Sequence, residues 1–333
     1  METSRQKSSR VSRFVFLKMI SLLCSSFSFV FLRNNNCKVR TLKNPSKGGK
    51  NSVTASVKSE RKSQKTFLSS FIKSPNKVTN IMADSKTVLI VGATGATGKH
   101  VVQILLDQGH VVKVVARSKE RMLSLLNGNQ DKNDRLQVKE AAILDLKQSE
   151  LNELVKDCDA VVSCLGHNLT REGIWGRANR RLVKDSVKRL VKAIEDNTTE
   201  KSTKKCKFVL MGSDGVAHPN DDKRSAMERG IIFLLRYLLP PHADNEEAAA
   251  FLLNDCNDKS VEWSVVRPTD LQDGDMFDYE IFPKPQGSLF GSGIATRANV
   301  AKFMVDLVLK EDMWSQYRHQ MPVLHDAKDS TKN

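Results

Sequence analysis

The stretch VLIVGATGATG at residues 88–98 places an apolar run directly before three glycines that are spaced three residues apart. Residues 99–108 follow with apolar side chains at helical spacing, and residues 111–116 form a second apolar run. A buried strand, a glycine-rich turn, a helix and a second strand in this order are typical of the phosphate-binding unit of a dinucleotide site.

Each glycine of this turn has a predicted task. Gly92 permits the tight turn, Gly95 lets the backbone approach a pyrophosphate, and Gly98 lets the helix pack closely on the strand. The N–H groups at the helix start and its positive dipole end offer an anion site, to which Thr94 and Thr97 add hydroxyl donors. The alternative, a glycine-rich turn that holds no ligand, stays open.

The residues after the second strand indicate which dinucleotide is bound. An Asp or Glu about 20 residues past the glycines holds a ribose 2′-hydroxyl, whereas an Arg accommodates a 2′-phosphate. The chain has Arg117, Ser118 and Lys119 here and no acid before Glu120. Because a guanidinium forms two charge-assisted hydrogen bonds with a phosphate, we expect NADP(H) rather than NAD(H). The alternative is that Arg117 and Lys119 are the solvated start of a helix.

The excess of basic residues lies entirely in the first 81 residues. The whole chain has a formal net charge of +15. Residues 1–81 hold 17 Lys and Arg and two acids, Glu2 and Glu60, whereas residues 82–333 hold 36 basic and 36 acidic residues. Because the part expected to fold is electrically balanced, its charge gives no reason to expect a nucleic-acid partner.

The first 81 residues resemble a targeting presequence. Four basic residues precede an apolar run at residues 14–32, as in a signal peptide or signal anchor, and residues 33–81 have the acid-poor composition of a transit peptide. This combination predicts import into a plastid (chloroplast) surrounded by extra membranes. Two alternatives stay open: residues 14–32 anchor the protein to a membrane, or translation starts at Met82 and the protein is cytoplasmic.

The six cysteines show no C-x-x-C pair and no His spacing typical of zinc. No metal site is therefore predicted. Small buried thiols in a reducing compartment are the expected state of these side chains.

From residue 86 onward, predicted strands and helices alternate, which is typical of a parallel sheet with helices on both faces. We expect one Rossmann-type, doubly wound α/β domain over residues 82–333, with a small C-terminal extension on the substrate side. Further strands are predicted at 136–142, 159–165, 208–211, 263–266 and 321–325, and further helices at 148–156, 177–197, 231–239 and 297–310, the last one capped by Thr296.

Ligands bind at the carboxyl ends of the strands in such folds. Asp145 should therefore lie near the adenine, Gly166 beside the ribose and phosphates, and Ser213 near the nicotinamide. The apolar helix at 231–239 is too short to span a bilayer. It is interpreted either as a substrate lid or as a buried helix that closes the core or meets a second subunit.

Residues 86–325 resemble the atypical short-chain dehydrogenase/reductase superfamily, near the NmrA-like proteins and the biliverdin-IXβ (flavin) reductases. The glycine turn is the diagnostic motif. The other matching marks are Arg117, Asp145, Leu165, Gly166, Ser213 and the stretch 266–268, VRP. The resemblance implies that Ser213 lies beside the substrate and that the cofactor is held by Gly92, Thr94, Gly95, Thr97, Gly98, Arg117, Ser118, Asp145, Leu165 and Gly166.

The sequence departs from that superfamily at the acid catalyst. Most members use a Tyr and a Lys four residues later, but none of Tyr237, Tyr279 and Tyr317 has a Lys at that distance. The segment where the pair would fall contains His242, whose imidazole titrates near neutrality and is able to donate a proton.

A structural interpretation of His242 stays open beside the catalytic one. It belongs in that case to a capped turn, in which Asp244 or Asn245 caps the following helix and the next two glutamates complement the helix dipole.

These features predict an NADPH-dependent reductase that transfers hydride to a conjugated small molecule of flavin, quinone or tetrapyrrole type. Such an acceptor is able to take its proton from water, so the missing Tyr and Lys are no obstacle. A non-catalytic NmrA-like NADP(H) sensor is the alternative. Epimerase or dehydratase chemistry on a nucleotide sugar ranks last because it needs the missing pair.

Overall fold

The computed structural model of the protein describes residues 85–126, 134–166, 180–198, 205–238, 240–256, 261–287 and 293–327. The presequence predicted at residues 1–81 lies outside the described residues. Within the described ranges, no helix is both long and apolar enough to cross a bilayer.

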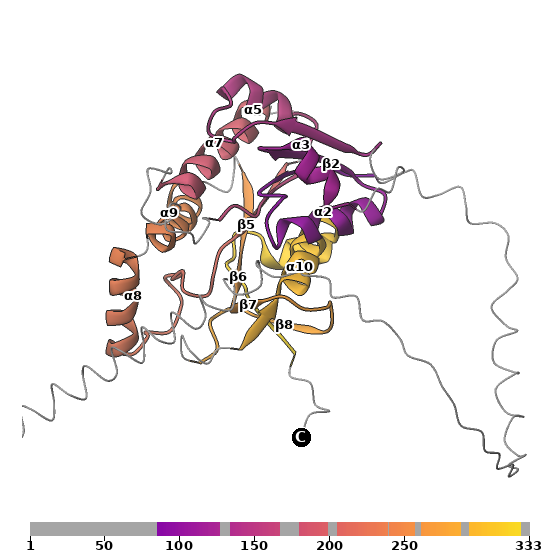
Figure 1. The fold of residues 1–333 in the computed structure, drawn as a ribbon. Helices are drawn as coiled ribbons and strands as arrows, with labels where there is room; N and C mark the ends of the chain where they lie inside the picture. Colours follow the sequence, from indigo (N-terminus) through magenta and orange to yellow (C-terminus); the bar gives the residue numbers. More distant parts are fainter. Residues whose placement is uncertain are drawn as a thin grey trace, which may run out of the picture. The chain divides into compact units, whose positions relative to one another are not determined.

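The described chain is built on an eight-stranded sheet (Figure 1). Its strands are β1 (Thr87–Val91), β2 (Val111–Ala116), β3 (Leu136–Glu140), β4 (Ala160–Ser163), β5 (Lys207–Met211), β6 (Glu262–Pro268), β8 (Tyr279–Phe282) and β10 (Val323–Asp326). The order across the sheet is β3-β2-β1-β4-β5-β6-β10-β8, and every neighbouring pair is parallel except β10 with β8. The order reverses between β1 and β4, so the predicted doubly wound Rossmann arrangement is confirmed.

Helices cover both faces of the sheet (Figure 1). One face carries α2 (Gly98–Asp107) and α10 (Arg297–Leu309), and the other carries α5 (Gln148–Val155), α7 (Leu182–Asn197) and α9 (Pro240–Asp255). Successive strand side chains point to opposite faces. Accordingly Ile90 packs in the core beneath α2 and α10, whereas its neighbour Val91 packs in the core beneath α7.

The remaining elements lie outside these two layers. They are the helices α3 (Lys119–Ser124), α8 (Ala226–Leu238) and α11 (Glu311–Tyr317) and the strands β7 (Asp270–Gln272) and β9 (Ile294–Thr296), which pair in parallel as a small second sheet. Thr296 caps α10 as predicted, because its side-chain oxygen accepts a hydrogen bond from the Asn299 N–H at 3.4 Å.

Helix α9 begins earlier than the sequence pattern indicated. Its first residue is Pro240, so Asp244 lies inside the helix, and the expectation that Asp244 or Asn245 caps it is wrong. The buried Asp244 carboxylate instead caps α7, where it accepts hydrogen bonds from the N–H groups of Val183 at 2.7 Å and Lys184 at 2.9 Å. One side chain thereby joins α9 to the start of α7.

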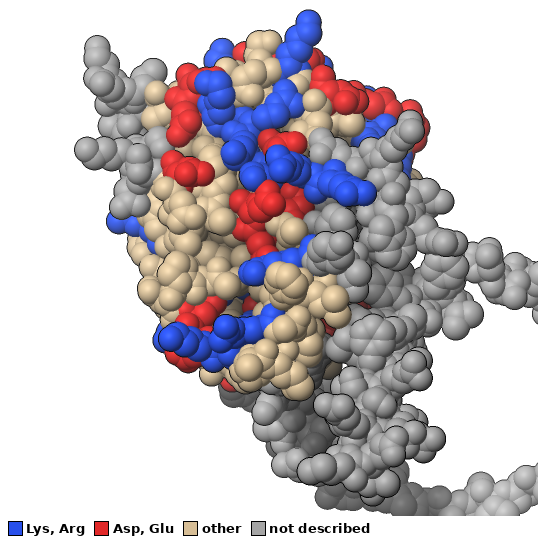
Figure 2. All heavy atoms as spheres, turned by 90° about the vertical axis from the view of Figure 1, so that its left-hand side faces the viewer, with Lys and Arg blue, Asp and Glu red and all other residues tan. Residues whose placement is uncertain are grey.

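The side of the molecule that carries α8 and α9 shows a mixed charge pattern. Figure 2 views this side, and Lys and Arg side chains lie there beside Asp and Glu side chains. The pattern agrees with the balanced composition of residues 82–333.

Candidate functional site

The turn after β1 is packed tightly against its own surroundings. Gly92 has a φ of +79°, and a Cβ added to it would lie 2.5 Å from the carbonyl oxygen of Cys164. A Cβ on Gly98 would lie 2.2 Å from the carbonyl oxygen of Gly92. Both positions therefore require glycine for reasons internal to the protein: the turn rests on the end of β4, and α2 rests on the turn.

Gly95 differs from its two neighbours in the motif. A Cβ added to it meets only the Gly92 carbonyl oxygen, at 3.1 Å, and one added to Gly166 meets no atom within 4 Å. Both glycines border space that the described protein does not fill. Internal packing thus restricts Gly95 less than the other two glycines, as expected of a position that a ligand approaches.

The start of α2 has unused hydrogen-bond donors. Thr97 occupies the N-cap position, yet its side chain makes no capping bond. Among the described residues, no group accepts a hydrogen bond from the N–H of Thr97 or of Gly98. An open glycine turn with unpaired N–H groups at a helix start fits the pyrophosphate of a dinucleotide.

The residues after β2 form a small polar cluster. Arg117 is exposed, and Ser118 caps α3 by accepting the Arg121 N–H at 3.1 Å. The Ser118 hydroxyl also donates to Glu120 at 3.0 Å. Hydrogen bonds from the Glu120 backbone and from Ser118 lower the pKa of that carboxyl. A carboxylate therefore stands beside the two residues predicted to hold a 2′-phosphate.

The other predicted cofactor residues lie at the carboxyl edge of the sheet. Asp145 is exposed after β3, and Gly166 is exposed after β4. The backbone nitrogen of the half-buried Leu165 would lie 2.8 Å from a Cβ on Gly92. The loops after β1 and β4 therefore touch, which places Gly166 in the loop next to the glycine turn.

Ser213 and His242, the two predicted catalytic candidates, both lie near Gly215. A Cβ on Gly215 would lie 3.0 Å from His242 Cε1 and 3.5 Å from Ser213 Oγ. Ser213 follows β5, whereas His242 lies in the first turn of α9. The packing of α9 beside the end of β5 thus brings together two polar side chains that are 29 residues apart in the chain.

The surroundings of His242 favour the uncharged form of its imidazole. Burial lowers its pKa from the ordinary 6.5 more than Glu246 raises it. Its Nε2 is buried and has no hydrogen-bond partner among the described residues, the nearest carboxylate oxygen being that of Glu246 at 3.6 Å. Glu246 is itself paired with Arg236 through bonds of 2.5 and 2.9 Å. A buried ring nitrogen without a hydrogen-bond partner is rare in a folded protein, which makes His242 a candidate functional group.

Tyr279 and Tyr317, whose side chains the structure describes, pack against the hydrophobic core and not at the candidate site. The rings of Tyr279 and Tyr317 pack on Phe303 of α10, with centroids 6.0 and 5.5 Å away. Desolvation and Asp306, which accepts the Tyr279 hydroxyl at 3.1 Å, raise the pKa of Tyr279. Both tyrosines lie in the core on the α10 face, whereas α9 covers the opposite face, so neither reaches His242.

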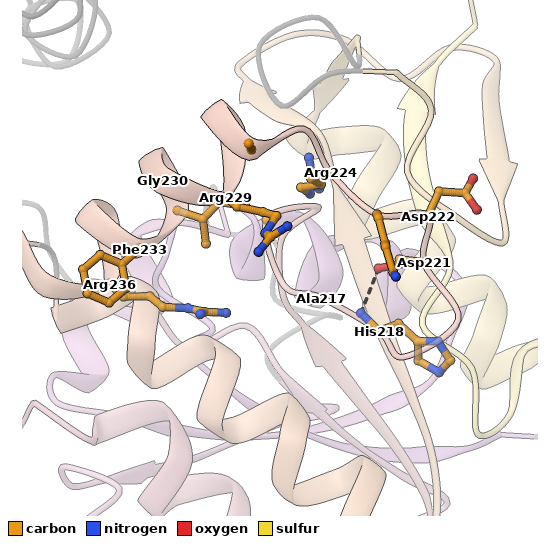
Figure 3. A pocket seen from close by; sticks show the side chains of 13 residues that line it. Ala217, His218, Asp221, Asp222, Arg224, Arg229, Gly230, Phe233 and Arg236 are labelled. Carbon is orange, nitrogen blue, oxygen red and sulfur yellow. Dashed lines mark hydrogen bonds between the residues drawn. The ribbon is translucent and has the colours of Figure 1, made fainter.

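A cavity of about 600 Å³ adjoins Gly215, between the loop after β5 and helix α8 (Figure 3). Figure 3 shows the side chains of Arg229 and Arg236 extending from α8 toward its open centre. Arg229 precedes the apolar helix predicted at 231–239, and Arg236 lies within it, but the sequence did not indicate a ligand role for either. The available signal was the Ser-x-x-Glu capping box at residues 225–228, in which the Ser225 N–H donates to Glu228 at 3.0 Å and the Glu228 N–H to Ser225 at 3.3 Å.

No three His, Cys, Asp or Glu side chains are grouped to hold a metal ion in the part of the chain that the structure describes. The described cysteines, Cys158, Cys164, Cys206 and Cys256, are all unbridged.

Comparison with solved structures finds the same fold in distant proteins. A candidate NADH-flavin reductase from Streptococcus pneumoniae superposes with a TM-score of 0.53 at 17% identity, over 73% of this chain and 100% of its own. An oxidoreductase from Lactococcus lactis gives 0.52 at 16% identity, over 73% and 91%. An anaerobilin reductase from Escherichia coli gives 0.50 at 16% identity, over 73% and 98%. At these identities the likeness establishes the fold.

Comparison of the sequence with curated proteins finds no match. A family model described as NAD(P)H-binding matches residues 92–311, which is more than half of the chain and includes all three motif glycines. The match, the unpaired N–H groups at α2 and the doubly wound sheet agree on a nicotinamide dinucleotide as cofactor. The chain belongs to the NAD(P)H-binding family.

Proposed function

We propose that the protein is an NADPH-dependent reductase whose acceptor is a conjugated small molecule of flavin, quinone or tetrapyrrole type. The observation that carries the proposal is that Ser213 and His242 both lie near Gly215, which lines a cavity of about 600 Å³. That volume suits a drug-sized ring system.

The proposed roles follow from the chemistry of the side chains. The nicotinamide supplies a hydride when it is bound. Ser213 orients the acceptor through its hydroxyl, and His242 gives or relays a proton through Nε2, which has no partner among the described residues. A conjugated acceptor needs little more than orientation, since its reduced form is able to take its proton from water.

The preference for NADPH is part of the proposal. Arg117 is exposed after β2, where a 2′-phosphate would be held, and it supplies the positive charge. The carboxylate of Glu120, which accepts a hydrogen bond from Ser118, would repel the 2′-phosphate. The size of the preference for NADPH therefore depends on the balance between Arg117 and Glu120.

The names of two structural relatives support the choice of acceptors to test. One is a candidate NADH-flavin reductase and another an anaerobilin reductase. A flavin and a linear tetrapyrrole are therefore the first acceptors to offer.

The test is a screen of acceptors with the full chain, NADPH and NADH, in which nucleotide oxidation is followed by absorbance. Sustained oxidation with a flavin, quinone or tetrapyrrole, abolished by Gly95→Trp, is the expected result. Tight NADPH binding without turnover of any acceptor would overturn the reductase proposal and favour the NADP(H) sensor.

For residues 1–81 we propose a role in import into a plastid, based on their composition. Fluorescence microscopy of a fusion of residues 1–81 to a fluorescent protein tests it. Signal in the plastid is the expected result, whereas signal confined to another membrane or to the cytoplasm would overturn it.

A further inference from the structure

The cavity between α8 and the loop after β5 is lined by more cations than acids. Its basic residues are Lys223, Arg224, Arg229 and Arg236, and its acidic residues are Asp221 and Asp222. The excess matters only if the charges are not already paired.

The acids of the cavity are both engaged elsewhere. Asp221 binds the fully buried Arg267 through contacts of 2.6 and 3.1 Å. Asp222 lies 3.1 Å from Lys284, which is not a lining residue. Neither carboxylate forms an ion pair with a lining arginine in the described part of the chain.

The cations differ in how much of their hydrogen-bonding capacity is used. Arg236 is paired with Glu246. Arg224 donates from Nη2 to the carbonyl oxygen of Asp214 at 2.6 Å and makes no other hydrogen bond with the described residues. Arg229 and Lys223 have no side-chain partner in the described part of the chain. Arg229 and Arg224 together thus present most of two guanidinium forks to the cavity.

An aromatic ring lies on the same helix as Arg229. Phe233 lines the cavity one turn beyond Arg229 and is 71% exposed. A large exposed ring and an unpaired guanidinium group that line one cavity offer a planar ligand an apolar surface and an anion site at once.

We propose that this cavity selects acceptors that carry an acidic arm, a phosphate or a carboxylate, which Arg229 and Arg224 bind while the conjugated ring extends toward Gly215. This inference rests on the proposed reductase function, because only that function makes the bound ligand a hydride acceptor. Two of its elements support the connection: Gly215 lines the cavity and also touches Ser213 and His242, and Arg224 braces Asp214, the neighbour of Ser213.

The experiment compares pairs of ligands that share a ring system and differ in charge. FMN carries a phosphate that riboflavin lacks, and biliverdin carries two carboxylates that its dimethyl ester lacks. Binding of each to the full chain is measured by fluorescence or absorbance titration without NADPH, so that the result does not depend on turnover.

The variants separate recognition by the cavity from general attraction. Arg229→Gln removes the charge and the fork, and Arg229→Lys keeps only the charge. Arg318→Gln is the control, because Arg318 is exposed and pairs with Glu262 at the amino end of β6, on the opposite edge of the sheet. All variants keep residues 1–81, so any anion binding by that basic segment is the same in each.

The acidic member of at least one pair is expected to bind more tightly than its neutral partner, and added salt should reduce the difference. Arg229→Gln should weaken the acidic ligand about tenfold, which corresponds to about 1.4 kcal/mol, and leave the neutral one unchanged. Arg229→Lys should fall between the two, since a Lys cannot form the planar fork. If FMN is selected and biliverdin is not, the arm is a phosphate; the reverse assigns a carboxylate.

Equal affinity within both pairs, no binding of either acidic ligand, or equal losses in Arg229→Gln and Arg318→Gln would each overturn the inference. These outcomes leave the reductase proposal to the acceptor screen. A failed screen combined with Arg229-dependent binding would overturn the reductase function and keep the acidic ligand.

Discussion

Arg267 and Asp221 form a pair with two hydrogen bonds inside the protein, 2.6 Å from Nη1 to Oδ2 and 3.1 Å from Nη2 to Oδ1. Arg267 is fully buried, and it also donates to the carbonyl oxygens of Met321 and Val216 at 2.6 and 3.1 Å. Since Arg267 belongs to β6 and Asp221 to the loop after β5, the pair fixes the cavity loop to the sheet.

Asp221→Ala is therefore expected to destabilise the protein by about 3 kcal/mol, because it leaves a buried guanidinium without its counter-charge. Urea denaturation measures the change in free energy of unfolding. Asp222→Ala is the matched control, since Asp222 is 85% exposed and its ion pair with Lys284 contributes little. Equal losses for the two variants would contradict the role given to the buried pair.

Asp244→Ala should cost about 1 to 2 kcal/mol, since it removes the cap of α7 and leaves two backbone N–H groups unpaired. The free energy of unfolding is again the measurement. Asn245→Ala, at the neighbouring position of the same helix, should change it by less than about 0.5 kcal/mol. A larger loss for Asn245 than for Asp244 would show that the cap has been assigned to the wrong residue.

The three motif glycines should separate into two classes. Gly98→Ala should lower the melting temperature, because its Cβ would lie 2.2 Å from a backbone oxygen. Gly95→Val should lower the melting temperature of the apo protein less than Gly98→Ala does, because its Cβ would lie 3.1 Å from the same oxygen, and should abolish dinucleotide binding in calorimetry. Unaltered binding by Gly95→Val would mean that the ligand does not approach this turn.

Arg117 and Glu120 should have opposite effects on cofactor choice. Arg117→Ala is expected to weaken NADPH about tenfold or more and to change NADH little, because only the former carries the 2′-phosphate. Glu120→Gln should strengthen NADPH by removing a carboxylate next to the site. Calorimetric titration of both nucleotides checks both variants, and equal losses of NADPH and NADH in Arg117→Ala would refute the assignment.

The reaction should depend on pH through His242. Burial lowers the pKa of His242 from 6.5, so the protonated imidazole becomes the minor form before the pH reaches 6.5. If this form donates the proton, kcat should fall as pH rises through the lowered pKa. The free energy of unfolding should change with pH in the opposite direction to kcat. The unfolded chain takes up the proton first as pH drops past 6.5, so the free energy of unfolding decreases toward acid. His242→Gln should flatten both profiles, and a kcat profile left unchanged by this variant would remove His242 from the chemistry.

The sequence predicted the parallel core well because long apolar runs determine it. Val111–Ala116 has its predicted bounds, and the predicted strand at 208–211 starts one residue earlier, at Lys207. The sequence did not predict the strand Tyr279–Phe282. This strand is short and only half-buried, and it is held by antiparallel pairing with β10, more than forty residues away. Pairing of this kind is a long-range property that no local pattern contains.

The site was predictable in part. The glycine turn, Ser213 and His242 could be named because motif and residue type indicate their chemistry. The arginines of the cavity could not, since an Arg on an amphipathic helix has the same pattern whether it faces a ligand or solvent. The cap from Asp244 to α7 joins residues about sixty positions apart, and only the tertiary arrangement discloses it.

The Asp244 cap also constrains motion. His242 stands two residues before Asp244 on α9, so swinging α9 outward would strip two backbone N–H groups of α7 of their acceptor. Among the described residues, α8 is joined to α9 by the ion pair of Arg236 with Glu246, in which the Arg236 side chain is 47% exposed. If the cavity opens to admit a ligand, we expect α8 to move and α9, with His242 on it, to stay in place.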